Sequence, residues 1–265
     1  MGWILAITGK GGVGKTTLAA LAVRWLAEHR HGPVLAVDAD PNSCLDAALG
    51  VRVREAVGSV REETRRMVQA QAQAQATADP ATATLAGIGK QELLEMKIQQ
   101  AIVESDDFDL IAMGRPEGPG CYCYANNVLG AAVRSLAGKY PSIVLDNEAG
   151  LENLSRRIVT RVDQLVFVTD PSQRGLTTTR RLYDLAVEMT VDAPAIGAVI
   201  NRARDAGCVD RLRKALEGTP VEVLGVLPEN EQLAEWDAAG RSLLELPAEN
   251  PVCAAAAAIF DRMIR

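Results

Sequence analysis

A glycine-rich segment directly after the first apolar stretch constrains the fold of this chain most. Trp3–Thr8 is followed by Gly9-Lys10-Gly11-Gly12-Val13-Gly14-Lys15-Thr16-Thr17, and helical spacing then runs to Arg30. A glycine-rich loop between a strand and a helix can turn its N–H groups toward phosphate oxygens, and the helix start adds a favourable dipole. We therefore expect a nucleotide-binding loop in which Lys15 reaches the β- and γ-phosphates and the Thr16 hydroxyl binds Mg²⁺. The other loop contacts are expected from Gly11, Gly12, Val13, Gly14 and Thr17.

Short apolar segments alternate with stretches of helical spacing along almost the whole chain. After Trp3–Thr8, the apolar segments are Val34–Val37, Leu110–Met113, Ile143–Leu145, Leu165–Val168, Ile196–Ile200 and Val223–Val226. The helical stretches include Thr16–Arg30, Thr177–Met189 and Cys208–Glu217. Consecutive apolar positions are typical of parallel strands buried on both faces, and strand–helix alternation favours right-handed crossovers. The sequence therefore predicts an α/β fold with a doubly wound, mostly parallel sheet flanked by helices, as a single domain over residues 1–265.

One segment lacks this alternation. From Glu55 to Gln100 no strand pattern occurs, and Gln71–Thr84 is a low-complexity tract rich in Gln, Ala and Thr. Ala and Gln are good helix formers but offer little apolar surface to bury. We expect a helical, low-complexity excursion around residues 55–100 that carries no chemistry. The alanine-rich stretch Cys253–Phe260 predicts a packed final helix.

Acidic residues follow two of the predicted strands. Asp38 and Asp40 come after Val34–Val37, and Asp146 comes after Ile143–Leu145. Ligands of open α/β sheets bind at the carboxyl ends of the strands, so these carboxylates should face the nucleotide. If the chain stays extended, Asp38 and Asp40 share one side, so that one can act toward Mg²⁺ and the other can orient the attacking water. A hydrophobic strand that ends in Asp is the Walker B arrangement, which places Asp146 near Mg²⁺, and Gly150 would let the next segment respond to the γ-phosphate.

Two cysteines separated by one residue stand between the third and fourth predicted strands. Gly and Pro are frequent just before Cys121 and Cys123, so we expect a bent segment without regular structure. Residues i and i+2 lie on the same side of an extended segment, which would let both thiolates bind one metal ion at about 2.3 Å. Two thiolates fill only half of a tetrahedral site. A twofold homodimer would bring the same patch from both copies together and complete it.

The remaining cysteines and the charge exclude several classes of protein. Cys44, Cys208 and Cys253 stand singly near or within helices, where we expect them to be buried. Five cysteines, an odd number, do not suit a secreted disulfide scaffold. The net charge of −6 argues against broad binding to nucleic acid, and no apolar run reaches the roughly 18 residues of a membrane span. We expect a reduced, cytoplasmic protein with no nucleic-acid partner and no stable membrane insertion.

The phosphate loop resembles the deviant Walker A motif, KGGxGK[ST], of the MinD/ParA-type branch of P-loop ATPases, because Lys10 adds a second lysine near its start. The resemblance implies nucleotide-dependent dimers in which Lys10 crosses to the partner's phosphates. It also implies that Asp40 positions the attacking water and that Asp38 lies on the metal side. Two later turns would hold the adenine, one with Asn201 and Arg202 and the other with Pro228 and Glu229.

A longer similarity extends from Met1 to roughly Asn230. The segment Met113–Asn127, with its Gly-Arg-Pro-Glu-Gly-Pro-Gly-Cys-x-Cys run, resembles the CooC-type nickel-insertion ATPases that serve carbon monoxide dehydrogenase maturation. Asp146–Gly150 and Leu154–Arg157 share the resemblance, whereas the Gln71–Thr84 tract departs from it. The resemblance implies ATP-driven dimerisation, binding of Ni²⁺ (or Zn²⁺ in its absence) at the cysteine pair, and delivery to apo carbon monoxide dehydrogenase. A sister branch that serves acetyl-CoA synthase shares these motifs.

Two other functions stay open from the residues alone. An electron-transfer ATPase similar to the nitrogenase iron protein would hold a [4Fe–4S] cluster with the cysteines of a dimer. In that family one cysteine lies beyond the Walker B switch, and Asp146–Asp170 contains no cysteine. A positioning ATPase would ride on DNA or membrane, which the net charge and the alanine-rich end disfavour. All of these functions use ATP or ADP with Mg²⁺.

Overall fold

The computed structural model of the chain describes residues 2–30, 32–58, 96, 98–115, 121–151 and 161–264, with the backbone alone for residues 121–124. Most of the predicted excursion around residues 55–100 therefore lies outside the described residues. The Gly- and Pro-rich residues 116–120 and the segment Leu154–Arg157 lie outside them as well.

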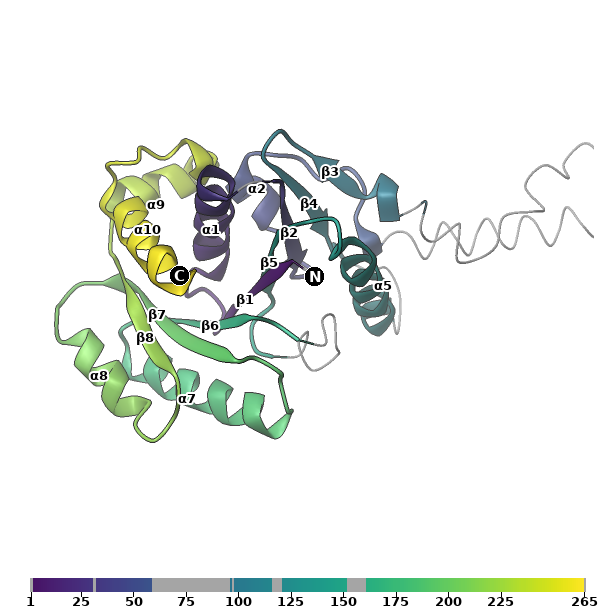
Figure 1. Cartoon of the computed structure of the whole chain (residues 1–265). Coiled ribbons are helices and arrows are strands. Elements are labelled where there is room, and N and C mark those ends of the chain that lie inside the picture. Colours follow the sequence, from purple (N-terminus) through teal and green to yellow (C-terminus); the bar gives the residue numbers. More distant parts are fainter. Residues whose placement is uncertain are drawn as a thin grey trace, which may run out of the picture.

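One sheet contains all the strands of the described residues (Figure 1). Its order is β3-β4-β2-β5-β1-β6-β7-β8, and every neighbouring pair is parallel except β3 and β4. The strands are β1 (Trp3–Gly9), β2 (Val34–Ala39), β3 (Ile102–Glu104), β4 (Phe108–Ala112), β5 (Ser142–Asn147), β6 (Gln164–Thr169), β7 (Ala195–Ala203) and β8 (Glu222–Pro228). The central strands are buried at nearly every position, which is why their sequences are continuously apolar. The predicted α/β fold with a mostly parallel sheet is confirmed.

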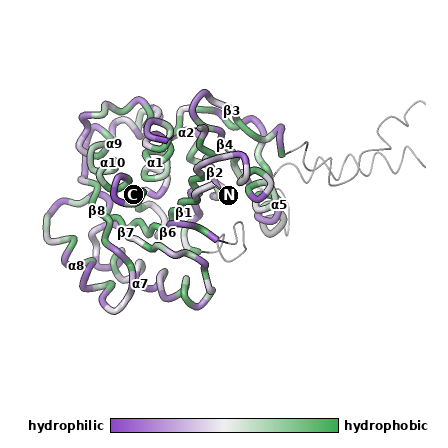
Figure 2. The backbone as a smooth tube through the Cα atoms, in the orientation of Figure 1, coloured by the Kyte–Doolittle hydropathy of each residue, from purple (hydrophilic) through white to green (hydrophobic). Residues whose placement is uncertain are grey.

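Helices cover both faces of the sheet. Helices α1 (Lys15–His29), α2 (Leu45–Leu49) and α10 (Pro251–Met263) pack with Leu5 and Ile7 of β1 on one face. Helices α5 (Cys121–Leu136), α7 (Gln173–Glu188) and α8 (Cys208–Ala215) pack with Ile4 and Ala6 on the other, as the alternation of side chains along a strand requires. Figure 1 shows α1 beside α10 on one side of the sheet and α7 with α8 on the other. Figure 2 shows hydrophobic colour along the central strands and more hydrophilic colour along α7 and α8. The described elements also include α9 (Glu231–Ala238) and the 3₁₀ helix η2 (Leu243–Glu245).

The predicted strands are all present, with ends that differ from the prediction by three residues or fewer. The prediction of an irregular segment at the cysteine pair is wrong, because α5 begins at Cys121. Buried apolar residues follow at helical spacing: Ala125, Val128, Leu129, Ala132, Val133 and Leu136. The sequence contains this helical period, but the Gly and Pro residues before Cys121 favour a segment without regular structure. Strand β3 was not predicted, since three residues are too few to show a period.

The two edges of the sheet end differently. At one edge, β3 pairs with β4 in the antiparallel direction over Ile102–Glu104 only. At the other edge, Nη1 of Arg262 in α10 donates to the carbonyl oxygen of Leu224 in β8 at 2.9 Å. Nη2 of the same arginine pairs with Glu222 at 2.8 Å.

The parallel strands bring their carboxyl ends to one edge of the sheet. The loops after β1, β2, β5, β7 and β8, which carry most of the predicted site residues, therefore meet there. No helix in the described part of the chain is both long enough and apolar enough to cross a bilayer.

Candidate functional site

The glycine-rich loop joins the end of β1 to the start of α1. Gly12 and Gly14 have φ values of +77° and +93°, in the left-handed region that glycine adopts without strain. Gly14 is the N-cap of α1 and has no side chain to cap it, so the first N–H groups of this helix can bind phosphate oxygens. Lys15 is almost fully buried, and its Nζ lies 3.4 Å from the carbonyl oxygen of Lys10. Lys10 itself is exposed.

The end of β7 holds this loop in place. Nδ2 of Asn201 donates to the carbonyl oxygen of Val13 at 2.9 Å, and Oδ1 of Asn201 accepts from the backbone N–H of Arg202. Arg202 has a left-handed φ of +56°, and its Nη1 donates to the carbonyl oxygen of Gly12 at 3.2 Å. The side chain of Asn201, predicted to contact adenine, is therefore bound to the phosphate loop in this structure.

Thr16, Asp38 and Asp146 lie close to one another beside the phosphate loop. Asp38 and Asp146 are direct partners in the parallel register of β2 and β5. Oγ1 of Thr16 donates to Oδ2 of Asp146 at 2.6 Å. The other oxygen, Oδ1, is buried and has no hydrogen-bond partner within the described ranges. A buried carboxylate oxygen beside a hydroxyl is a donor set that suits Mg²⁺, so the residues present fit the predicted ion.

Burial raises the pKa values of Asp38 and Asp146. Desolvation, with a smaller contribution from the charge of Asp38, raises the pKa of Asp146 from its ordinary value of 3.8 to about 7, although Thr16 and Lys15 oppose the shift. Desolvation also raises the pKa of Asp38 to about 6, against the hydrogen bonds from Leu45 and Asp40. A cation bound between them would remove this penalty, because it favours the charged form.

The chain turns directly after β2. The carboxylate of Asp38 accepts from the backbone N–H groups of Asp40 at 3.0 Å and Leu45 at 3.0 Å. The chain does not stay extended from Asp38 to Asp40, since β2 ends at Ala39, so the condition under which the two carboxylates would share one side is not met. Asp40 lies half-buried on that turn, and its Oδ1 accepts from both the N–H and the Nδ2 of Asn42.

The segment after β5 is tied to the end of β1. The N–H of Gly150 donates to the carbonyl oxygen of Gly9 at 3.2 Å, and Oγ1 of Thr8 donates to the carbonyl oxygen of Gly150. Nδ2 of Asn147 donates to the carbonyl oxygen of Ile7 at 3.0 Å. Thr8 and Asn147 were missed as site residues; both are polar residues at the ends of buried strands, and that signal could have found them.

The turn after β8 is joined to the end of β7. The N–H of Glu229 donates to the carbonyl oxygen of Ala203 at 3.1 Å. The carboxylate of Glu229 binds the guanidinium of Arg204 through two hydrogen bonds, at 2.5 and 2.6 Å. Pro228 ends β8 directly before it. Asn201 and Arg202 thus lie within the last residues of β7 rather than in a turn, and Pro228 and Glu229 lie at the adjacent end of β8.

The cysteine pair starts a helix. Residues two apart in a helix do not share a face, so the extended geometry expected for Cys121 and Cys123 does not hold for this backbone. Of the single cysteines, Cys208 is buried as predicted, Cys253 is half-buried, and Cys44 is exposed, contrary to prediction. Cys44 precedes the short helix α2 at the turn after β2, where only Leu45 and Leu49 of that helix are buried.

Residues 4–243 match the CobQ/CobB/MinD/ParA nucleotide binding domain. The chain belongs to this family. It is 39% identical to an uncharacterised ATP-binding protein of Methanocaldococcus jannaschii over 98% of both chains. It is 28% identical to the carbon monoxide dehydrogenase accessory protein CooC of Rhodospirillum rubrum over 98% of this chain and 97% of CooC.

Solved structures of MinD and ParA proteins share the fold of this family member. A ParA family ATPase from Chlorobium tepidum has a TM-score of 0.71 at 19% identity, with 100% of this chain and 98% of the other covered. The MinD protein of Pyrococcus horikoshii, solved with Mg-ADP, has a TM-score of 0.71 at 22% identity, with 100% and 97% covered. The chain thus has a nucleotide-binding domain by its family and shares the fold of MinD and ParA proteins.

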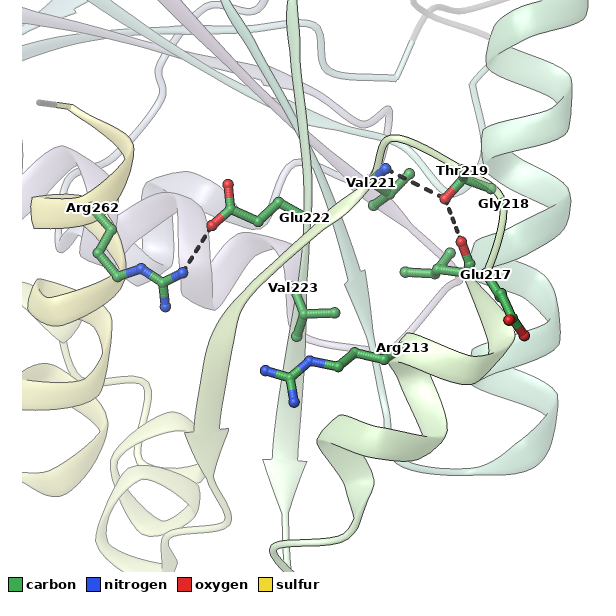
Figure 3. A pocket seen from close by; sticks show the side chains of 9 residues that line it. Arg213, Glu217, Gly218, Thr219, Val221, Glu222, Val223 and Arg262 are labelled. Atoms are coloured by element: carbon green, nitrogen blue, oxygen red, sulfur yellow. Dashed lines mark hydrogen bonds and ion pairs between the residues drawn. The ribbon is translucent and has the colours of Figure 1, made fainter.

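A separate cavity of about 400 Å³ lies near the start of β8, away from the carboxyl ends of the parallel strands (Figure 3). Arg213 and Arg262 line it, and each pairs with a carboxylate, Asp210 and Glu222 respectively. None of the predicted site residues lines this cavity. In this member of the CobQ/CobB/MinD/ParA family, the cavity is therefore separate from the phosphate loop and from the carboxyl ends of the parallel strands.

Proposed function

We propose that this family member is an ATP-hydrolysing metallochaperone that binds Ni²⁺ between two copies of the chain and assists its insertion into carbon monoxide dehydrogenase. The observation that carries the proposal is the sequence Cys121-Tyr122-Cys123 at the start of α5. Strand β4, which leads toward it, ends beside Asp38 at the nucleotide edge. The similarity to CooC over nearly the full length of both chains supports the same role.

Hydrolysis in this proposal uses groups of the phosphate loop and of the neighbouring strand ends. Lys15 neutralises charge on the β- and γ-phosphates, and the N–H groups at the start of α1 bind their oxygens. Asp40 orients the attacking water, and Lys10 of the partner copy reaches the same phosphates. Bound Mg²⁺ would neutralise developing charge on the phosphates. Thr16 and Asp146 would hold it, with Asp38 alongside.

Adenine recognition is proposed at the neighbouring strand ends. The ends of β7 and β8 lie next to each other through the bond between Glu229 and Ala203. Asn201 and Arg202 from one end, and Pro228 and Glu229 from the other, would flank the base. Asn201 would serve the loop and the base together, because an amide nitrogen has two hydrogens to donate and Val13 accepts one of them.

The cargo site needs two copies of the chain. Each copy would supply two thiolates, whereas a tetrahedral thiolate site takes four. Because residues two apart in a helix do not share a face, the first turn of α5 would have to open for Cys121 and Cys123 to reach the same ion. Within the described ranges no group of three or more His, Cys, Asp or Glu side chains is arranged to hold a metal ion. ATP and metal would each favour the homodimer, and by linkage each would then raise the affinity for the other. Zn²⁺ also satisfies thiolates and could replace Ni²⁺.

The client follows from the chemistry of nickel insertion and from the CooC relative. Apo carbon monoxide dehydrogenase is the first candidate, and apo acetyl-CoA synthase is the alternative. Both would be tested by loading each apo-enzyme with Ni²⁺ from the protein in the presence of Mg-ATP. Transfer to one and not to the other would identify the client.

The metal proposal is tested by titrating Ni²⁺ and Zn²⁺ into Cys121→Ala/Cys123→Ala. We expect stoichiometric metal binding to disappear while ATP binding is unchanged. The matched control is Cys44→Ala/Cys253→Ala, which removes two cysteines outside the pair and should bind metal normally. Unchanged metal affinity in the first variant would overturn the proposal. An iron assay and a visible spectrum of anaerobically purified protein test the iron–sulfur alternative.

ATP hydrolysis is tested with Lys15→Ala, which should bind ATP weakly and release no phosphate. A variant that hydrolysed ATP at the wild-type rate would contradict the role of the loop.

A further inference from the structure

We propose that Arg115 is a positioning residue for Asp40, and that it joins the turn after β2 to the segment that leads into the cysteine pair. The turn consists of residues 40–44, called here the Asp40 turn. We call the contacts between the Asp40 turn and Gly114–Arg115 the joint. The inference that this joint serves metal delivery rests on the proposed function. The contacts that define the joint do not depend on it.

The first contact orients the carboxylate of Asp40. Its Oδ1 accepts from the backbone N–H of Asn42 at 2.8 Å and from Nδ2 of Asn42 at 3.1 Å. Two donors from one residue converge on one oxygen, so the carboxylate can rotate only if Asn42 moves as well. The orientation of Asp40 therefore depends on the amide of Asn42.

The second contact orients that amide. Nη2 of Arg115 donates to Oδ1 of Asn42 at 3.1 Å. A guanidinium only donates and a carboxylate only accepts, so the amide fits between them in one orientation, with Oδ1 toward Arg115 and Nδ2 toward Asp40. Without Arg115, the amide loses the donor that selects this orientation. Asn42 and Arg115 are both exposed, so the joint lies at the surface and its contribution is modest.

A second connection runs parallel to the first. Oγ of Ser43 donates to the carbonyl oxygen of Asp40 at 3.3 Å and accepts from the backbone N–H of Gly114 at 3.2 Å. Ser43 and Gly114 both have left-handed backbones, with φ of +42° and +63°. Such a conformation in a serine persists only where its surroundings impose it. The backbone bond from Met113 N–H to the carbonyl oxygen of Asp38, at 2.8 Å, fixes the start of this segment.

The joint therefore links a residue proposed to orient water with a segment six positions before Cys121. A shift of Asp40 when nucleotide binds would move Asn42, Arg115 and Gly114 together. The reverse also holds, because a change at the cysteine pair that displaced Arg115 would release the carboxylate of Asp40. The joint would thus couple ATP hydrolysis to metal binding at the cysteine pair by a shared movement of the two segments.

The test measures hydrogen exchange in peptides that cover residues 38–45 and 110–115 of the full chain, with and without a non-hydrolysable ATP analogue and Mg²⁺. In the wild type we expect slower exchange in both peptides. In Asn42→Ala and in Arg115→Ala we expect the response to remain in residues 38–45 and to shrink in residues 110–115. The control is Arg213→Ala, an exposed arginine that lines the cavity near the start of β8, which should behave as the wild type does.

A kinetic measurement distinguishes positioning from a general structural role. Arg115→Ala should lower kcat for ATP hydrolysis by about three- to tenfold, with KM for ATP within about twofold of the wild type. Arg115→Lys should recover most of kcat, since an ammonium group also donates to Oδ1 of Asn42. In Asn42→Ala/Arg115→Ala, kcat should be no lower than in the worse single variant, because both changes break the same contact.

Two results would overturn the inference: an undiminished exchange response of residues 110–115 in both single variants, or no response there in the wild type. A wild-type protein that bound no metal would overturn the proposed cargo function and leave these exchange results decisive for the joint. The two failures are therefore distinguishable.

Discussion

Gly14 has no room for a side chain. Its φ is +93°, and a Cβ atom added there would lie 2.1 Å from Nδ2 of Asn201, which holds the carbonyl oxygen of Val13. A side chain at position 14 would thus strain the loop and also displace its support. The position is constrained twice, by backbone conformation and by the end of β7.

We expect Gly14→Ala to weaken ATP binding by about tenfold or more, which corresponds to about 1.4 kcal/mol, because both the strain and the clash deform the loop. Isothermal titration of ATP into the purified variant would measure this. Gly240→Ala is the matched control: its φ is +63° and no atom lies within 4 Å of an added Cβ. It should lose some stability and retain ATP affinity; an equal loss of affinity in both variants would contradict the explanation.

Without a bound cation, the buried carboxylate of Asp146 destabilises the folded protein when it is charged. Its pKa is raised to about 7 by burial first, whereas the unfolded chain has a value near 3.8. Between these two pH values the folded protein binds more protons than the unfolded one, so its stability falls as pH rises through this window.

Asp146→Asn should therefore stabilise the nucleotide-free protein at pH 8 by on the order of 2 kcal/mol, and the gain should shrink toward pH 5. An asparagine oxygen can still accept from Thr16, so the packing changes little. Thermal unfolding across this pH range measures the effect. Saturating Mg-ATP should reverse the order, because the wild-type carboxylate gains a cation. A variant less stable than the wild type at pH 8 without nucleotide would contradict the prediction.

The sequence was most informative where one local pattern contains the chemistry. The spacing of Lys15 and Thr16 after a glycine run predicts the phosphate loop, and the structure brings Thr16 into contact with Asp146, the other residue expected near Mg²⁺. The support that Asn201 gives to Val13 joins residues 188 positions apart, so no local pattern could reveal it. The same holds for Arg115 and Asn42, whose contact depends on how two loops settle beside each other.

At the scale of elements, β8 and α10 approach each other closely. A Cβ atom added at Gly225 of β8 would lie 2.7 Å from Cγ1 of Ile259 in α10, so a bare backbone is needed for this contact. Ile259 belongs to the buried layer that also contains α1. Helix α10 thus depends on a glycine in an edge strand.

Gly225→Ala should destabilise the protein by about 1–3 kcal/mol, because the added methyl group forces α10 away from the strand. Urea unfolding followed by circular dichroism would give the change in free energy of unfolding. Gly138→Ala is the control: position 138 is exposed, and no atom lies within 4 Å of an added Cβ. Equal stability of the two variants would show that α10 adjusts without cost.

Elements were predictable where periodicity was long and unbroken. The central strands follow from their continuous apolar runs, and α1 follows from its spacing. The start of helix α5 was not predictable because the Gly and Pro residues before Cys121 favour an irregular segment, whereas its apolar period starts only at Ala125. Helix α9 was missed because it has no fully buried residue and so shows little contrast between its faces.

At the scale of the whole molecule, the exposed Lys10 stands at the nucleotide edge, outside the buried part of the loop. Lys10→Ala should bind ATP yet remain monomeric with Mg-ATP, because the proposed contact with the partner's phosphates is lost. Light scattering coupled to size exclusion would show the mass of each variant. Lys139→Ala, an exposed lysine in the turn before β5, is the charge-matched control and should still form dimers. Dimers of both variants would rule out this role for Lys10.

The two edge strands of the sheet, β3 and β8, are poorly suited to pair with a strand of another molecule. Strand β3 offers only three residues to a foreign strand, and Arg262 already occupies a carbonyl group of β8. Continuing the sheet from one molecule into the next is therefore unfavourable at both edges, which protects the chain from uncontrolled fibre growth. In the proposed function, a homodimer that forms and dissociates with ATP would benefit from sheet edges that do not pair permanently with another molecule.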